Sequence, residues 1–252
     1  MPYTEIVTVR DTSPAGAALG TFLGQSQNRP NAGTGISEIL TNLDSYEHKG
    51  VADKLVRLQE FTGEGTSRCL GGSHLQAFAN ELGTPCVLVP NAQGGSAMHV
   101  DADNGNGSWT PGEALYDAAV ANIQAAQTLT GLTLDFIIWC QGERDSAAIP
   151  GDISAAQYTI AFKAMADALK AEFPDSILLI VRTGRELGSD PHADVRAEQD
   201  GWDEYASGYV QMVETAASAY TDAGDYAADG IHWSQLRHNE HMVTCAQFYN
   251  GL

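Results

Sequence analysis

Short apolar runs alternate with longer segments of helical spacing along most of this 252-residue chain. The runs end at Gly, Pro or Asp, as buried strands do, and they cover residues 18–23, 86–89, 134–139 and 177–181, with a weaker one at 209–213. The segments between them predict helices over residues 51–61, 72–82, 111–129 and 155–173. Strands that alternate with helices predict βαβ units, and therefore a parallel sheet covered by helices on both faces.

One domain accounts for this pattern. A chain of this length that is 43% hydrophobic can bury a sizeable core, and no internal repeat or long linker divides it. We therefore expect a lead-in of residues 1–16 and a single domain over residues 17–252. Within it, Thr110 and Pro111 predict the start of one helix, and Ser154 predicts the cap of the next.

The formal net charge of −19 limits the partners of the chain. Such a surface repels phosphate backbones and anionic headgroups, so we expect no nucleic-acid or membrane partner, whereas a neutral sugar is compatible with it. No segment approaches the ~20 apolar residues of a membrane span, and no signal peptide is evident. With few lysines, this acidity is typical of a salty habitat or of a secreted or virion location, which the sequence does not separate, and we favour an extracellular or virion-associated location over a cytoplasmic one.

The predicted architecture makes the position of polar loops informative. Ligands of open parallel sheets bind beyond the carboxyl ends of the strands. Ser26 follows the first strand, residues 91–96 follow the second, and residues 141–145 follow the third. Three polar loops are therefore expected at one edge of the sheet.

These loops and one later segment contain the groups that acyl transfer needs. A serine hydroxyl becomes a good nucleophile when an imidazole takes its proton, and a carboxylate fixes the tautomer of that imidazole. Ser26 could supply the hydroxyl, and Asp229 and His232, three residues apart, could supply the carboxylate and imidazole. Each motif alone has a simpler explanation, which for Ser26 is an ordinary turn serine.

Taken together, the motifs resemble those of a known superfamily. The segments GQS at 24–26, GGS at 94–96, QGE at 141–143 and DGIH at 229–232 occur in the order and approximate spacing of SGNH hydrolases. They look most like the sialate O-acetylesterase-like branch and the acetylxylan esterases of carbohydrate esterase family six. VRAEQ at 195–199 resembles the VRxxQ segment of that branch.

The resemblance implies a fold and an activity. The fold is a flavodoxin-like three-layer α/β/α sandwich with a parallel central sheet. The activity is that of a serine esterase that removes O-acetyl groups from an acetylated oligo- or polysaccharide through an acetyl-enzyme intermediate. Neither a cofactor nor a metal is expected.

Site residues follow from the same resemblance. Ser26 would be the nucleophile, His232 the general base and then acid, and Asp229 the group that orients His232. The backbone N–H of Ser26, Gly94 and the side chain of Gln141 would form the oxyanion hole. Further pocket or supporting residues are expected at Gln25, Gly95, Glu143, Asp145, Arg196, Trp109 and Trp233.

Three of those supporting residues have a more specific expectation. Glu143 would hold the Gln141 loop, and Asp145 and Arg196 would brace it by charge pairing. Two positions depart from the family pattern: Gln27 stands where an asparagine usually follows the serine, and Cys140 precedes QGE where His or Tyr is common. Both departures leave the triad intact, so they bear on substrate more than on activity.

Other residues that could take part in binding or chemistry have a structural explanation as well as a functional one. Trp109, Trp202 and Trp233 could stack on sugars or pack in the core. His238 and His241 are three apart on the last helix, where a solvated face is a better explanation than a metal site. Cysteines are expected as core thiols, although Cys69 and Cys86 could form a disulfide in an oxidising compartment. A calcium loop at residues 101–113 is disfavoured because its ligand spacing is wrong.

Two further hypotheses stay open. A carbohydrate-binding or virion-surface module could keep this fold with little turnover, and an SGNH lipase or thioesterase would use the same chemistry on a different acyl group. A GxSxG elbow is absent, which argues against an α/β-hydrolase. The oligomeric state does not follow from the sequence.

Overall fold

The fold is taken from a computed structural model, which describes residues 9–10, 12–28, 45–49, 54–57, 74–203, 205 and 208–252. Its centre is an eight-stranded sheet with the strand order β1-β4-β3-β5-β2-β6-β7-β8. Neighbouring strands from β3 to β8 run parallel, whereas β4 is antiparallel to both β3 and β1. The strands are β1 (Val9–Arg10), β2 (Ala18–Gly24), β3 (Tyr46–Lys49), β4 (Lys54–Arg57), β5 (Cys86–Pro90), β6 (Phe136–Cys140), β7 (Ile177–Val181) and β8 (Val210–Glu214).

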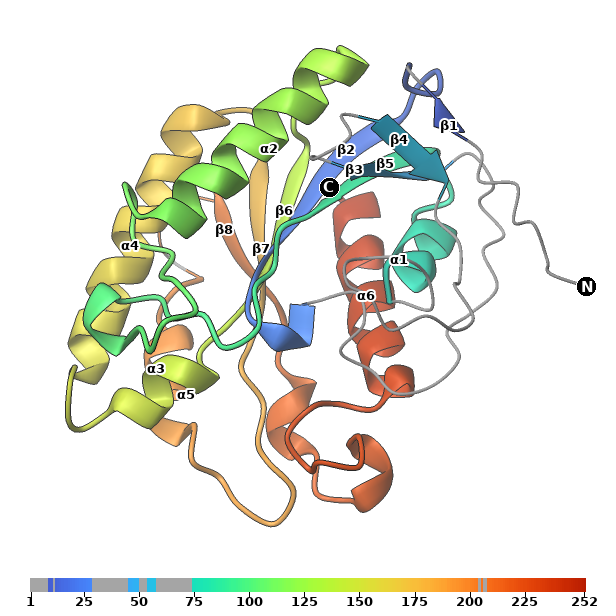
Figure 1. The fold of residues 1–252 in the computed structure, drawn as a ribbon. Helices are drawn as coiled ribbons and strands as arrows, with labels where there is room; N and C mark the ends of the chain where they lie inside the picture. Colours follow the sequence, from blue (N-terminus) through green and yellow to red (C-terminus); the bar gives the residue numbers. More distant parts are fainter. Residues whose placement is uncertain are drawn as a thin grey trace, which may run out of the picture.

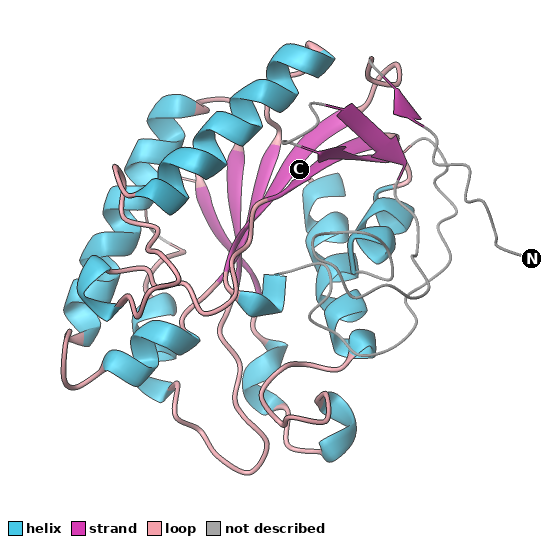
Figure 2. Ribbon diagram, viewed as in Figure 1, coloured by secondary structure: helices cyan, strands magenta, loops and turns pink. Residues whose placement is uncertain are grey.

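Helices cover both faces of the sheet, as the sequence predicts (Figures 1 and 2). One face carries α2 (Ala114–Thr130) and α4 (Ala155–Glu172), and the other carries α1 (His74–Leu82) and α6 (Gln235–Asn250). Two short helices, α3 (Glu143–Ala148) and α5 (Ala193–Gln199), lie toward the carboxyl ends of the strands. The molecule is therefore a three-layer α/β/α sandwich. Within the described part of the chain, no helix is long and apolar enough to cross a membrane.

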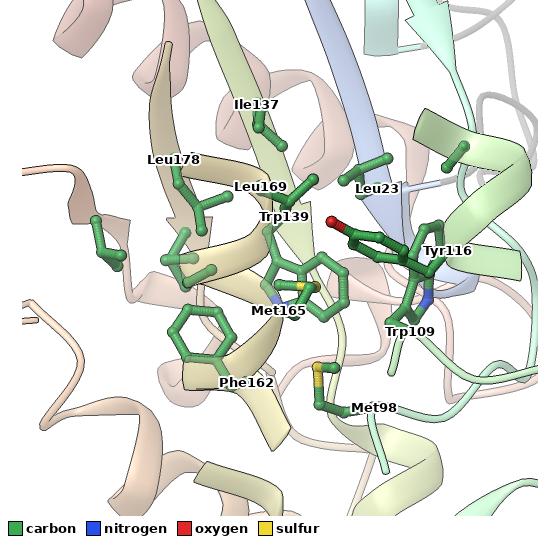
Figure 3. Close-up of a cluster of buried hydrophobic side chains, with 14 of the residues drawn as sticks. Leu23, Met98, Trp109, Tyr116, Ile137, Trp139, Phe162, Met165, Leu169 and Leu178 are labelled. Carbon is green, nitrogen blue, oxygen red and sulfur yellow. The ribbon is translucent and has the colours of Figure 1, made fainter. Parts of the chain in front are cut away.

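Side-chain alternation along the strands builds two cores. On β6, Ile137 and Trp139 pack under α2 and α4, whereas Phe136 and Ile138 pack under α1 and α6. Successive side chains of a strand point to opposite faces, so a strand covered on both sides is apolar throughout. Figure 3 shows the first core, where the rings of Trp139 and Phe162 lie between the sheet and the helices.

Most predicted elements are confirmed, and the local signals explain their bounds. The strand over residues 177–181 agrees with β7, and the capping box of Ser154 and Gln157 begins α4 at Ala155. The helix predicted at residue 111 begins instead at Ala114. Gly112 has a φ of +89°, which a right-handed helix does not accommodate, so the chain makes a turn before the helix.

One prediction near the first edge of the sheet is wrong. Residues 54–57, inside the helix predicted at 51–61, form β4 and pair with β3. The apolar residues of this short segment do not follow one clear period, so its conformation depends on its surroundings. Here the edge of β3 offers backbone hydrogen bonds to a strand. The lead-in likewise contributes β1, which pairs antiparallel with β4.

Candidate active site

The polar loops meet at the carboxyl edge of the sheet, as expected for a parallel sheet. A single 3-10 turn (Ser26–Asn28) follows β2, a glycine turn follows β5, and α3 follows β6 (Figure 1). The loop after β7 and the segment before α6 also reach this edge.

Ser26 is presented by a turn that depends on Gly24. Gly24 has a φ of +104°, and a Cβ on it would lie 2.2 Å from the carbonyl oxygen of Cys140. The next residue, Gln25, donates its backbone N–H to that same carbonyl at 2.8 Å. The end of β2 is thus locked against β6, and Ser26 leaves the sheet in a partly exposed position.

The segment before α6 places a carboxylate against an imidazole. Asp229 Oδ2 lies 2.6 Å from Nδ1 of His232, and its Oδ1 accepts the backbone N–H groups of Ile231 and His232, each at 3.0 Å. Partial burial works to raise the pKa of Asp229, but these hydrogen bonds lower it to about 2. The carboxylate therefore stays ionised, holds Nδ1 as the donor, and leaves Nε2 as the basic nitrogen.

Gln27, which follows Ser26 in the same 3-10 turn, connects that turn to the segment that carries His232. The Gln27 side chain donates to the carbonyl of Ile231 at 3.1 Å and accepts the N–H of Trp233 at 3.2 Å. Both residues are described, and the structure gives no hydrogen bond between the Ser26 hydroxyl and the His232 ring. Gln27 therefore attaches the Ser26 turn to the backbone on both sides of His232.

Backbone donors for an oxyanion lie in the first two loops. Within the described residues, the N–H groups of Ser26 and Gly94 make no hydrogen bond. Gly95 completes the turn with a φ of +71°, and a Cβ there would press on the side chain of Asn106. Ser96 anchors the turn, because its hydroxyl donates to the carbonyls of Gly24 and Gln93.

The side chain of Gln141, which the sequence predicts as a member of the oxyanion hole, makes internal contacts in this structure. Gln141 is fully buried, and its amide nitrogen donates to Asp145 and, at 3.2 Å, to the carbonyl of Ser96. The same nitrogen lies 3.4 Å from Oε1 of Gln25. An amide nitrogen whose two hydrogens are met by internal acceptors ties the loops together.

The backbone carbonyl of Gln141 is held by residues that the sequence did not single out. It accepts hydrogen bonds from the Tyr158 hydroxyl at 3.0 Å, the Thr183 hydroxyl at 2.8 Å and the Gln199 amide at 2.8 Å. Gln199 is the last residue of the VRAEQ segment, so the sequence motif could have indicated this role. Nothing in the sequence marks Tyr158, which comes from the middle of α4.

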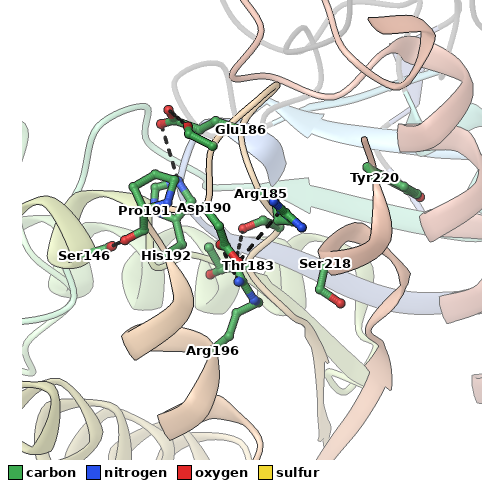
Figure 4. Close-up of polar contacts among 12 residues, drawn as sticks. Ser146, Thr183, Arg185, Glu186, Asp190, Pro191, His192, Arg196, Ser218 and Tyr220 are labelled. Carbon is green, nitrogen blue, oxygen red and sulfur yellow. Dashed lines mark hydrogen bonds and ion pairs between the residues drawn. The ribbon is translucent and has the colours of Figure 1, made fainter. Parts of the chain in front are cut away.

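Asp145 joins two of the loops, although not by charge pairing. Besides Gln141, its carboxylate accepts the backbone N–H groups of Met98 at 2.7 Å and His99 at 2.9 Å. Burial raises the pKa of Asp145 even though these hydrogen bonds oppose the shift. Arg196 is not its partner. Its guanidinium binds Asp190 and the carbonyl of Gly184, and so shapes the loop after β7 (Figure 4).

Glu143 does not hold the Gln141 loop as expected. Neither of its carboxylate oxygens, which are shielded from solvent, makes a hydrogen bond to another described residue. Desolvation raises the pKa of this carboxyl, and the charge of His232 is among the influences that lower it. Glu143 therefore lies within electrostatic range of the histidine, while the loop depends on Gln199, Tyr158 and Thr183.

Comparison with known proteins identifies the family of the chain. The family described as carbohydrate esterase, sialic acid-specific acetylesterase, matches residues 61–234. The chain belongs to this family. It is therefore a carboxylic ester hydrolase of the carbohydrate acetylesterase type. Ser26 precedes the matched residues, and no curated protein sequence matches the chain.

Solved structures share the fold of this esterase. A protein from Arabidopsis thaliana is similar with a TM-score of 0.67 and 19% identity, over 93% of this chain and 98% of that one. NanS is similar with a TM-score of 0.63 and 15% identity, over 95% and 99% of the two chains. A carbohydrate acetylesterase from Xanthomonas citri has a TM-score of 0.51 and 18% identity, over 91% of this chain and 55% of its own.

The tryptophans of this carbohydrate esterase are core residues, which decides between the two roles that the sequence left open for Trp109, Trp202 and Trp233. Trp109 has no exposed surface, meets Trp139 edge-on and donates its indole N–H to Ser96. Trp202 stacks on Phe162 with the rings 3.4 Å apart at their centroids. Trp233 is buried against the histidines of α6. Their ring size favours burial wherever an opposing element covers them.

His238 and His241 are also buried, which corrects the expectation of a solvated helix face. His238 stacks on His74 of α1 at 5.2 Å, and His241 binds the Tyr220 hydroxyl at 3.2 Å. Burial lowers the pKa of His238 well below its usual value, so the ring is neutral. Among the described residues, no group of three or more His, Cys, Asp or Glu side chains could hold a metal ion.

The cysteines that the structure describes are buried free thiols: Cys86, Cys140 and Cys245. Burial raises the pKa of Cys86 to about 12 and that of Cys140 well above its usual value. Cys140 is therefore no nucleophile, as expected. Cys69, the suggested disulfide partner of Cys86, lies outside the described residues.

Proposed function

We propose that this carbohydrate esterase removes O-acetyl groups with Ser26 as nucleophile, His232 as general base and acid, and Asp229 as the group that orients His232. The observation that carries the proposal is the Asp229–His232 pair, which Gln27 ties to the turn of Ser26 at the carboxyl edge of the sheet. The family of the chain supplies the reaction class, and these residues supply the groups that the class requires.

The proposed reaction proceeds in two halves. His232 Nε2 takes the proton of the Ser26 hydroxyl as Oγ attacks the acetyl carbonyl, and the charge on the carbonyl oxygen is met by the N–H groups of Ser26 and Gly94. The intermediate collapses, the bond to the sugar oxygen breaks, and His232 returns the proton to that oxygen. Water then attacks acetyl-Ser26 with His232 again as base, and acetate leaves.

Acetylated carbohydrate is the substrate class, and the charge of the chain narrows it further. A net charge of −19 favours neutral acetylated oligosaccharides over strongly anionic ones and disfavours nucleic-acid or membrane-surface partners. Because Trp109 and Trp233 are buried, we propose that polar groups of the described loops contribute to recognition of the sugar.

The test is acetate release by wild type and Ser26→Ala from p-nitrophenyl acetate, from acetylated xylo-oligosaccharides and from an O-acetylated sialic acid. We expect the variant to lose at least about 10³-fold in kcat, because the nucleophile is gone, while its circular dichroism is unchanged. The preferred glycan identifies the natural class of substrate. Equal activity of the folded variant and wild type would overturn the assignment of Ser26, and binding without turnover by wild type would favour a carbohydrate-binding module.

A further inference from the structure

The side chain of Gln27 occupies an unusual position between the nucleophile and the base. It belongs to the same 3-10 turn as Ser26, and only 3% of its surface is exposed. Its amide contacts a loop more than two hundred residues later in the chain, on the two peptide groups that flank His232. The residue that follows Ser26 therefore forms hydrogen bonds with the backbone on both sides of His232.

The two hydrogen bonds fix one geometry. The amide nitrogen donates to the Ile231 carbonyl at 3.1 Å, and the amide oxygen accepts the Trp233 N–H at 3.2 Å. Reversing the amide would set donor against donor and acceptor against acceptor, so its orientation follows from its partners. Because one planar group holds both peptides, His232 cannot move along or away from the Ser26 turn without breaking a buried hydrogen bond.

The other contacts of this loop do not set that distance. Asp229 is part of the same loop, so it orients the His232 ring relative to its own backbone. The backbone N–H of Leu187 binds the Gly230 carbonyl at 2.8 Å and attaches the loop to the segment after β7. Among the described residues, the side-chain hydrogen bonds between the Ser26 turn and the loop are those of Gln27.

We propose that Gln27 is a positioning residue that sets the distance and orientation of His232 relative to the Ser26 hydroxyl. The proposal rests on the function proposed above. This role also requires a side chain as long as that of glutamine. Asparagine carries the same amide on a side chain shorter by one methylene, about 1.5 Å, and cannot reach both peptide groups from this backbone.

The test compares Gln27→Met, which keeps the length and removes the amide, with Gln27→Asn, which keeps the amide and shortens it. Steady-state kinetics on p-nitrophenyl acetate give kcat and KM. The rate of Ser26 labelling by diisopropyl fluorophosphate, followed by intact mass, reports how well His232 activates the hydroxyl. The matched control is Gln235→Met, since Gln235 is a buried glutamine at the start of α6 whose amide binds Asn239 instead.

Both Gln27 variants are expected to lose at least tenfold in kcat and in labelling rate, with KM within about twofold of wild type and with native circular dichroism. The control should keep the wild-type labelling rate. Wild-type kcat and labelling in folded Gln27→Asn or Gln27→Met, with Ser26→Ala inactive, would overturn this proposal alone. Full activity of Ser26→Ala would overturn the proposed function, and the role of Gln27 with it.

Discussion

The Gln141 loop and the His232 loop both reach the candidate site, but they are attached to the fold in different ways. Gln141 and Asp145 are fully buried, and their polar atoms bind groups from α4, α5 and the loops after β2 and β5. His232 and Asp229 keep 29% and 47% of their side chains exposed, and the side chains that fix them are each other and Gln27.

This difference separates two tasks. A buried, hydrogen-bonded network is rigid, and removing one member leaves a desolvated polar group, so changes there act on stability. An exposed pair contributes little to stability, yet its geometry decides whether the proton can move, so changes there act on rate. The next substitutions test whether rate and stability divide along this line.

Substitution in the His232 loop should give the larger effect. Asp229→Asn keeps the size of the side chain but cannot hold Nδ1–H as a carboxylate does, so we expect kcat/KM to fall by about 10²- to 10⁴-fold. Unfolding free energy should change little, because the side chain is half exposed. Kinetics on p-nitrophenyl acetate together with urea unfolding measure both, with exposed Asp194→Asn as the control. A rate within twofold of wild type would contradict the role of Asp229.

The low pKa of Asp229 adds a pH test to the same substitution. Because the folded pKa is lowered to about 2, the carboxylate is ionised throughout the range in which the enzyme can be assayed. Titration of Asp229 should therefore add no ionisation to the pH profile of wild type within that range. An additional acidic ionisation that disappears in Asp229→Asn would show that Asp229 titrates in that range.

Substitution in the buried network should act on stability instead. Asp145→Asn replaces one of the carboxylate oxygens by an NH₂ group, which then faces a backbone or side-chain donor. An unsatisfied buried donor costs about 2–3 kcal/mol of unfolding free energy. Urea unfolding measures it, with the exposed Asp152→Asn expected within about 0.5 kcal/mol of wild type. Equal unfolding free energies of Asp145→Asn and Asp152→Asn would contradict the stability role assigned to the Gln141 loop.

A smaller, pH-dependent effect on stability is expected at His192, which lies near Arg196 (Figure 4). Burial, and then the charge of Arg196, lower the pKa of His192 to about 4. An unfolded chain takes up the proton near pH 6.5 and the folded one does not, so stability is complete above that pH and falls as the pH drops toward 4.

His192→Gln removes this linkage. The loss of unfolding free energy between pH 7 and pH 5 should be about 2 kcal/mol smaller in the variant than in wild type. Urea unfolding at the two pH values measures the difference. Parallel losses in the two proteins would show that His192 does not carry this part of the acid sensitivity, and would point to the other buried histidine with a lowered pKa, His238.

Sequence alone determined the features that depend on nearby residues. The apolar runs predicted the parallel strands, and Ser154 predicted the N-terminus of α4. The ends of the predicted strands indicated the edge of the sheet where the polar loops meet. The pairing of Asp229 with His232 follows from three residues of spacing in one turn. Such features are set by local hydrogen bonds and by strand periodicity, which a sequence displays directly.

Only the tertiary structure decided what each side chain faces. Whether Trp109 or His238 meets solvent depends on the element packed across from it, and residues 54–57 become a strand because β3 offers an edge. The amide of Gln141 turns inward because three acceptors from other loops converge on it. Gln27, a departure from the family pattern in the sequence, finds its partners beside His232 only when distant segments are brought together.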